Sequence, residues 1–285
     1  MRPLTLLLTL VATLFGLTAT ASAAQMTIYP PLAQGAASLL TISEAPAGSR
    51  FTGAVNGVPF PISASGHGLI ALDMSAKPGT RTVKVTITAP NHQKEVLKKG
   101  FRIKARDYNV ERIDGLPKKK VDLDNKDLTR AGGESKKIKA TYKRRTETAF
   151  FSNGFRMPAT GRFSGVFGSR RILNGKSRRP HNGVDIAAPT GTPITAIAPG
   201  IVALVGDDYF FTGNTVVLDH GHGAVSLYAH MDEIFVKEGE ILRPDTIIGK
   251  IGMTGRVTGP HLHMGVLVRG ARVDPMKLPG IYQKQ

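Results

Sequence analysis

Short runs of β-branched and apolar residues, separated by turns rich in glycine and proline, fill most of this chain and set its fold class. Residues 82–88 show the pattern clearly, because Val83, Val85 and Ile87 alternate with polar residues, as in a half-buried strand. Beyond residue 150 no long amphipathic helix is visible. The strands predicted there are residues 193–198, 201–205, 215–219, 224–230, 247–251 and 261–268. The chain is therefore predicted to be mainly β, with an antiparallel β-sheet domain at its C-terminal end.

The first 23 residues have the features of a secretory signal. Residues 4–17 carry no charge, and the segment ends in the small residues Ala21-Ser22-Ala23. The apolar run is shorter than the roughly 20 residues that a membrane-spanning helix needs, so cleavage after Ala23 is favoured over a membrane anchor. We expect an exported protein without a transmembrane segment after signal removal. The short signal and the lack of a wall-sorting segment favour the periplasm, with an extracellular location as the alternative.

Composition narrows what can stabilise the exported chain and what it can bind. The chain has no cysteine, so no disulfide holds it. Its 38 Lys and Arg residues outnumber its 21 Asp and Glu residues, which gives a net charge of +17. In the cytoplasm such a charge would suggest nucleic-acid binding. In an exported protein no nucleic acid is expected as a partner, and the available polyanions are wall polymers and membrane surfaces.

Three segments follow the signal. Residues 24–106 contain short strands with turn residues at regular spacing, which predicts a small β-sandwich of the immunoglobulin type. Residues 107–150 are predicted to be a basic linker, because eleven Lys and Arg residues stand against four acids between residues 117 and 145. This linker is expected to be partly helical, with an interruption at Gly132-Gly133, and to be either a solvated spacer or an arm that binds anionic wall polymers. Residues 151–285 form the last domain.

Six of the eight histidines lie in the last domain, where three segments together suggest a metal site. His181 lies on a loop that leads into a predicted strand, and Asp185, four residues later, lies near the start of that strand. An imidazole and a carboxylate oxygen are both suitable zinc ligands. His261 and His263 lie two apart on a predicted strand and therefore point to the same face. His230 is in a third apolar strand, where a single histidine would more often be a core residue.

The donor set points to a catalytic metal site. Three protein ligands would leave one coordination position open, whereas four ligands are typical of a structural zinc site. Without cysteine a thiolate site is excluded, but copper and nickel remain compatible with the donors. A half-repeat similar to that of lipoyl and biotinyl carrier domains is also visible. Neither copy has the lysine-bearing tip sequence of those domains, so the carrier interpretation is rejected.

These segments resemble the lysostaphin-type zinc endopeptidases, a metallopeptidase family that cuts peptidoglycan. The family pattern is His-x-x-x-Asp, then a single His, then His-x-His, and it is matched by residues 181–185, by His230 and by residues 261–263. The flanking sequences at residues 167–171 and 252–260 match as well. The resemblance extends from about residue 155 to residue 275.

By position, the resemblance implies that His181, Asp185 and His263 bind zinc, one Zn²⁺ per chain. It also implies that His230 and His261 are catalytic and are not ligands. The implied activity is hydrolysis of peptidoglycan cross-links by a metal-activated water, with stem peptides and cross-bridges as partners. A link between D-Ala and diaminopimelate is the first substrate expected, and an oligoglycine bridge is the second.

Some expectations stay open at this point. His220 and His222 match no ligand position of the family, and no tyrosine is assigned to the oxyanion. One alternative function is a metal-free homologue that activates or scaffolds other wall hydrolases. Another is a polyanion-binding protein whose β domains are structural, which the basic linker favours but the histidine pattern does not.

Overall fold

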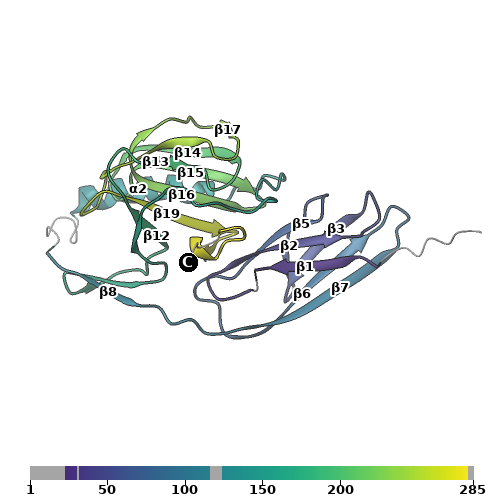
Figure 1. The fold of residues 1–285 in the computed structure, drawn as a ribbon. Helices are drawn as coiled ribbons and strands as arrows, with labels where there is room; N and C mark the ends of the chain where they lie inside the picture. The colour runs from purple at the N-terminus through teal and green to yellow at the C-terminus, as the bar shows by residue number, and fades with distance from the viewer. Residues whose placement is uncertain (1–22, 31, 116–123, 282–285) are drawn as a thin grey trace, which may run out of the picture.

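The computed structural model describes residues 23–30, 32–115 and 124–281 of the chain (Figure 1). In this part the protein is mainly β, as predicted, and its strands form four sheets. The predicted signal lies outside the described residues except for its last residue, Ala23. No helix in the described ranges has the length and apolar character needed to cross a membrane.

Two antiparallel sheets form the N-terminal domain, with strand orders β1-β2-β5 and β4-β3-β6-β7. Their strands are β1 (Gln25–Tyr29), β2 (Ala37–Ser43), β3 (Arg50–Val55), β4 (Val58–Phe60), β5 (His67–Ala71), β6 (Gly79–Thr88) and β7 (Lys94–Ile103). Leu40 and Ile70 of the first sheet share one core cluster with Val83 and Val85 of the second. The sheets thus pack on a common core, and the immunoglobulin type of this domain remains a prediction.

Strand β6 has the predicted alternation. Val83, Val85 and Ile87 are buried, and the residues between them are exposed or half-buried. The strand pairs with β7 along its whole length in antiparallel register. One apolar face on the core and one polar face toward solvent is the arrangement that the period of two predicts.

The segment between the two domains lies against the C-terminal domain. β8 (Val110–Ile113) pairs in parallel with β10 (Arg170–Leu173), which also pairs with β11 (Lys176–Ser177). α2 (Asn125–Thr141) begins after Asp124, whose carboxylate accepts a hydrogen bond from the backbone amide of Asp127. Its residue Ile138 packs on the sheet of the C-terminal domain.

The predicted helix interruption at Gly132-Gly133 is wrong, because α2 continues through both glycines. A glycine in a helix interior costs about 1 kcal/mol relative to alanine. Contacts with the sheet offset this cost: Ala131 is buried, and the Glu134 carboxylate accepts a hydrogen bond from the backbone amide of Phe210 at 2.7 Å. Such contacts are long-range and cannot be seen in local helix propensity.

The C-terminal domain is built on a ten-stranded sheet with the main order β17-β14-β15-β16-β19-β12-β9, and its strands pair in antiparallel fashion throughout the described residues. Its strands are β9 (Arg162–Gly165), β12 (Gly183–Ala187), β13 (Pro193–Thr195), β14 (Gly200–Tyr209), β15 (Gly213–Gly221), β16 (Ala224–Ile234), β17 (Ile241–Leu242), β18 (Ile247–Ile251), β19 (His261–Val268) and β20 (Ala271–Val273). A 3₁₀ turn, η1 (Pro275–Lys277), follows β20. The predicted strands 247–251 and 261–268 coincide with β18 and β19.

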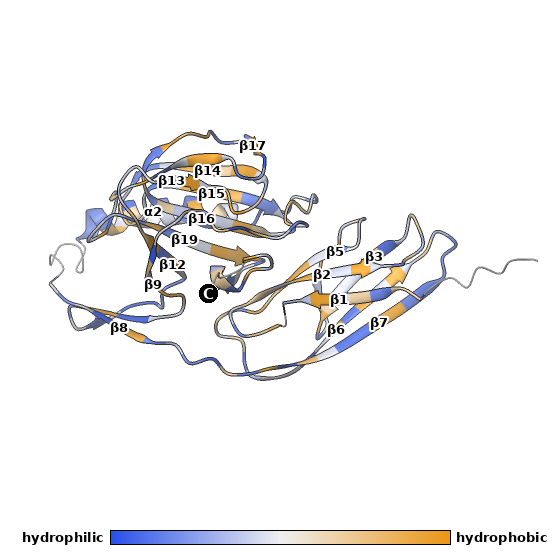
Figure 2. Ribbon diagram, in the orientation of Figure 1, coloured by the Kyte–Doolittle hydropathy of each residue, from blue (hydrophilic) through white to orange (hydrophobic). Residues whose placement is uncertain are grey.

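The central strands of this sheet are covered on both faces. Figure 2 shows apolar residues concentrated in these strands. Val216 and Met264 belong to the core cluster on one side, and Val217 and Leu227 belong to a second cluster that includes Ile138 of α2. A site built on these strands therefore has a well-packed support.

The two domains meet at the hairpin formed by β19 and β20 and at η1. The guanidinium of Arg272 donates to both carboxylate oxygens of Asp73, at 3.0 and 2.7 Å. Arg106 pairs with Asp274 at 2.8 Å. Leu69, from β5, also belongs to the core cluster of the C-terminal domain. Ion pairs and buried apolar contacts together fix this junction.

Candidate metal centre

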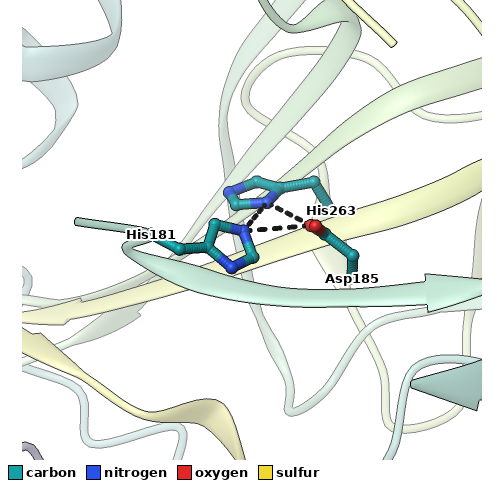
Figure 3. Close-up of side chains that lie close together, drawn as sticks. All are labelled: His181, Asp185 and His263. Atoms are coloured by element: carbon teal, nitrogen blue, oxygen red, sulfur yellow. Dashed lines mark hydrogen bonds and ion pairs between the residues drawn. The ribbon is translucent and has the colours of Figure 1, made fainter. Parts of the chain in front are cut away.

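His181, Asp185 and His263 come together at the neighbouring strands β12 and β19 (Figure 3). The two strands are antiparallel, and their register places Asp185 directly opposite His263. Residues opposite one another in a sheet project from the same face. The loop before β12 is tied to the chain near β10, because the backbone amide of His181 donates to the carbonyl oxygen of Ser169 at 2.9 Å. The structure thus brings together the three side chains that the family resemblance predicted to be metal ligands.

Three atoms of this group form a nearly regular triangle. His181 Nε2 lies 3.0 Å from His263 Nδ1, and His263 Nδ1 lies 2.8 Å from Asp185 Oδ1. The third side, from His181 Nε2 to Asp185 Oδ1, is 3.1 Å. Tetrahedral zinc with bonds of about 2.0–2.1 Å separates its ligand atoms by about 3.3 Å. The triangle therefore fits three corners of a zinc tetrahedron.

The protonation pattern of the group also suits a cation. His181 Nδ1 donates to the carbonyl oxygen of Val166 at 3.0 Å, which leaves the lone pair on Nε2, the atom that faces the other two ligands. Burial raises the pKa of Asp185, but its close contacts with the imidazoles of His181 and His263 hold it well below its ordinary value. Burial lowers the pKa of His263, opposed by the nearby Asp185. A charged carboxylate and neutral imidazoles are the forms that bind metal ions.

The second oxygen of Asp185 is held by an arginine. Arg171 Nη2 donates to Asp185 Oδ2 at 2.8 Å, and Arg171 Nε donates to Glu111 Oε2 at 3.0 Å. Arg171 lies in β10 and Glu111 in β8, opposite one another in the parallel pairing. The predicted linker, residues 107–150, thus reaches the metal centre through one side chain. Partners of this kind orient the ligand and leave its other oxygen for the metal.

His230 reaches the site because β16 is irregular. In the register with β15, Asn214 is opposite Met231 and Val216 is opposite Tyr228, so β16 contains one extra residue there. His230 has a φ of +65°, a conformation that non-glycine residues rarely adopt. Ala229 is opposite His263, so a regular strand would point His230 to the other face. The bulge re-aims its side chain, as bulges beside functional sites often do.

His230 and His261 lie next to one another, with ring centroids 4.8 Å apart, and the His230 ring lies 6.1 Å from that of His263. His230 Nδ1 donates to the carbonyl oxygen of Thr254, and His261 Nδ1 donates to that of Gly259, each at 2.9 Å. Both imidazoles therefore have Nε2 as their basic nitrogen. Burial, and then the charges of His263 and His261, lower the pKa of His230 to about 3, which keeps it neutral.

Sequence reasoning missed three residues that shape this centre. Arg171 holds Asp185, as described above. Gly165 and Gly183 leave space, because a Cβ at Gly165 would lie 2.8 Å from the carboxyl carbon of Asp185 and one at Gly183 would lie 2.8 Å from Cε1 of His263. The sequence signals were weak, since Gly183 reads as part of an Asn-Gly turn and Arg171 as one of many basic residues.

His220 and His222 are buried away from the three ligands. His220 Nδ1 donates to the carbonyl oxygen of Pro199 at 2.7 Å, and its Nε2 lies 2.7 Å from Ser226 Oγ. His222 Nε2 donates to the carbonyl oxygen of Glu147 at 2.7 Å. Both histidines thus connect strands and loops in the interior of the protein.

A cavity of about 810 Å³ lies elsewhere, at the junction of the domains. It is lined by residues 61–65, residues 145–149 and His222. None of the three grouped side chains lines it, so the cavity and the candidate metal centre are separate features.

Comparison with protein families gives one match that covers the site. The model of peptidase family M23 matches residues 179–275, which include both histidine segments and His230. A crystal structure named as a peptidase M23 from Pseudomonas aeruginosa is 30% identical to this chain. The alignment covers 82% of this chain and 93% of that one, with a TM-score of 0.57.

Curated relatives match a smaller part of the chain. The peptidoglycan DD-endopeptidase ShyA of Vibrio cholerae is 42% identical over 117 residues, which are 41% of this chain and 27% of that protein. The DD-carboxypeptidase/endopeptidase Mpg of Neisseria meningitidis is 39% identical over 117 residues, with the same coverage. The matched part thus spans about a quarter of the length of these relatives.

Proposed function

Because the chain belongs to peptidase family M23, we propose that it is an exported zinc-dependent endopeptidase that hydrolyses the peptide cross-links of bacterial peptidoglycan. In this proposal His181, Asp185 and His263 hold one zinc ion. The observation that carries it is the triangle of three ligand atoms, with sides of 2.8 to 3.1 Å, beside two further histidines. The two histidines supply the proton transfers that hydrolysis of a peptide bond requires.

Bound zinc would act as a Lewis acid that lowers the pKa of a coordinated water to about 7 and polarises the scissile carbonyl. Residues of the chain carry out the proton transfers and orient the ligands. His230 and His261 each have a basic Nε2, because each Nδ1 donates to a backbone carbonyl. One of these nitrogens accepts the proton of the attacking water, and the imidazolium that results can protonate the leaving amine. Arg171 keeps Asp185 oriented as a ligand throughout.

The proposed substrate is the link between D-Ala and diaminopimelate. The names of the relatives, peptidoglycan DD-endopeptidase and DD-carboxypeptidase/endopeptidase, support a bond between D-configured centres over an oligoglycine bridge. A peptidoglycan substrate also supports export to the periplasm, where the predicted signal at residues 1–23 would direct the chain. The basic linker remains a candidate for binding anionic wall polymers.

The test uses the mature chain, residues 24–285, on two purified walls. One wall is cross-linked through D-Ala and diaminopimelate, and the other through oligoglycine. The expected result is release of free amines and soluble fragments from the first wall, abolished by a zinc chelator and restored by zinc. His261→Ala should lower the rate about 10²- to 10⁴-fold, the usual contribution of a general acid or base.

Three results would contradict the proposal. They are cleavage that survives complete removal of metal, cleavage confined to the oligoglycine wall, and full activity of the His261→Ala variant. Stimulation of other wall hydrolases by a chain that cleaves neither wall would instead support the metal-free activator.

A further inference from the structure

Three arginines come from the two segments that border the candidate metal centre. One segment is the β10–β11 hairpin, whose Arg171 contacts Asp185, and the other is the loop that accepts hydrogen bonds from His230 and His261. Arg171 is in β10, and Arg178 follows β11 in the same hairpin, where its backbone amide donates to the carbonyl oxygen of Arg171 at 2.8 Å. Arg256 belongs to residues 252–260, the loop that joins β18 to β19. All three residues are partly exposed, so a bound substrate can reach them.

Arg256 is fixed on the loop that orients both proposed catalytic histidines. Its backbone amide donates to the carbonyl oxygen of Phe211 at 3.1 Å, and its guanidinium carbon lies 4.3 Å from the centre of the Phe211 ring. The same loop supplies the carbonyl groups that accept hydrogen bonds from His230 and His261. The Arg256 side chain is therefore tied to the segment next to the reacting groups.

Positive charge is concentrated on this side of the metal centre. Burial lowers the pKa of Arg256, and the charges of Arg178 and Arg171 lower it further. A negatively charged group of a substrate that lies across the centre would be attracted to this place.

We propose that Arg256 and Arg178 bind the free carboxylate that lies beside the scissile amide in a D-Ala–diaminopimelate cross-link. This inference rests on the proposed function. In such a link the amide nitrogen and a free carboxylate sit on the same carbon of diaminopimelate, so the anion lies next to the bond that breaks. A guanidinium binds a carboxylate through paired, charge-assisted hydrogen bonds. An oligoglycine bridge offers no carboxylate at this place, so the arginines would select against it.

The experiment compares three synthetic cross-linked peptide dimers. The first has the free carboxylate beside the scissile amide, the second has that carboxyl amidated, and the third has only the C-terminal carboxyl of the stem amidated. Dimer affinity is measured by calorimetry on the zinc-loaded His261→Ala chain, which should cleave the dimers about 10²- to 10⁴-fold more slowly than the wild type. Cleavage is measured as kcat/KM on the wild-type chain.

The arginine variants are Arg256→Gln and Arg178→Gln, and the matched control is Arg243→Gln, which removes the same charge from an exposed position between β17 and β18. We expect the unmodified dimer to bind about 10- to 100-fold more tightly than the dimer amidated beside the scissile bond, as for a charge-assisted hydrogen bond. Arg256→Gln should remove most of that difference, mainly through KM, and should keep its zinc. The control should behave as the wild type.

Each other outcome has a definite meaning. Equal affinity for the first two dimers overturns the inference. So does an equal loss of affinity for both dimers in Arg256→Gln, because Arg256 would then only shape its loop. A preference that follows the C-terminal carboxyl of the stem also overturns it. If the chain binds the unmodified dimer selectively but cleaves none, the carboxylate site stands and the proposed function fails.

Discussion

At the scale of single residues, Asp185 has a different partner for each of its carboxylate oxygens. Oδ1 faces the two imidazoles, and Oδ2 accepts a hydrogen bond from Arg171. Arg171 is held in turn by Glu111, which comes from the predicted linker. If the carboxylate lost this support, it could rotate away from the position in which it faces both histidines.

Replacing Arg171 by glutamine should therefore weaken zinc binding about 10- to 100-fold, the usual effect of losing a hydrogen bond to a metal ligand. Competition with a coloured chelator measures this affinity without any need for activity. The matched control is Arg170→Gln, an exposed neighbour in the same strand, which should bind zinc as the wild type does. Unchanged affinity in the Arg171 variant would mean that Asp185 is positioned by its strand alone.

At the scale of elements, β19 and β16 differ in how far the sequence reveals their geometry. The His-x-His spacing in β19 predicts one shared face, and the two histidines follow that regular period of two. His230 in β16 does not, because an extra residue and a φ of +65° turn it toward the site. Pairing register depends on partners far away in the chain. A bulge therefore cannot be recognised from a short stretch of sequence.

The helix α2 shows the same limit in another form. Its two adjacent glycines predict a break, and only packing against the sheet explains their helical conformation. Among the site residues, His181, Asp185 and His263 were accessible from spacing and family resemblance. Arg171 and Gly165 were not, because their importance lies in contacts with Asp185, which is 14 or more residues away along the chain.

Gly132→Ala and Gly133→Ala should each stabilise the protein by about 0.5–1 kcal/mol, because both glycines are exposed and an added Cβ meets no atom within 4 Å. Denaturant unfolding gives the free energy of unfolding for each variant. Gly221→Ala is the contrasting case and should destabilise, since Gly221 has a φ of +83° and its Cβ would collide with the backbone oxygen of Thr148. Loss of stability in both α2 variants would mean that these glycines are needed in the helix.

At the scale of the whole molecule, burial of polar groups links stability to pH. His220 is fully buried, and burial lowers its pKa from 6.5 to about 4. Between these values the unfolded chain binds a proton at this residue and the folded chain does not. The contribution of His220 is therefore complete above about pH 6.5 and is lost as the pH falls toward 4.

His220→Gln should make the free energy of unfolding less dependent on pH in this window, by at most about 3 kcal/mol, because one pKa unit corresponds to about 1.4 kcal/mol. The amide keeps a donor and an acceptor in place of the imidazole. Denaturant unfolding at several pH values between 7 and 4 gives the slope of the free energy of unfolding against pH. Part of this slope will remain in the variant, because other buried histidines also contribute to it. His92→Asn, at an exposed position, should keep the slope of the wild type. An equal slope in the His220 variant would show that its burial does not control acid stability.

The proposed activity requires one group of side chains to bind a metal while two neighbouring histidines stay free for proton transfer. Metal analysis of the purified, dialysed chain measures this directly. We expect about one zinc ion per folded chain in the wild type and in His261→Ala, and almost none in His263→Ala. A folded wild-type chain that takes up no divalent ion, or a His261→Ala chain that loses zinc as fully as His263→Ala, would contradict it.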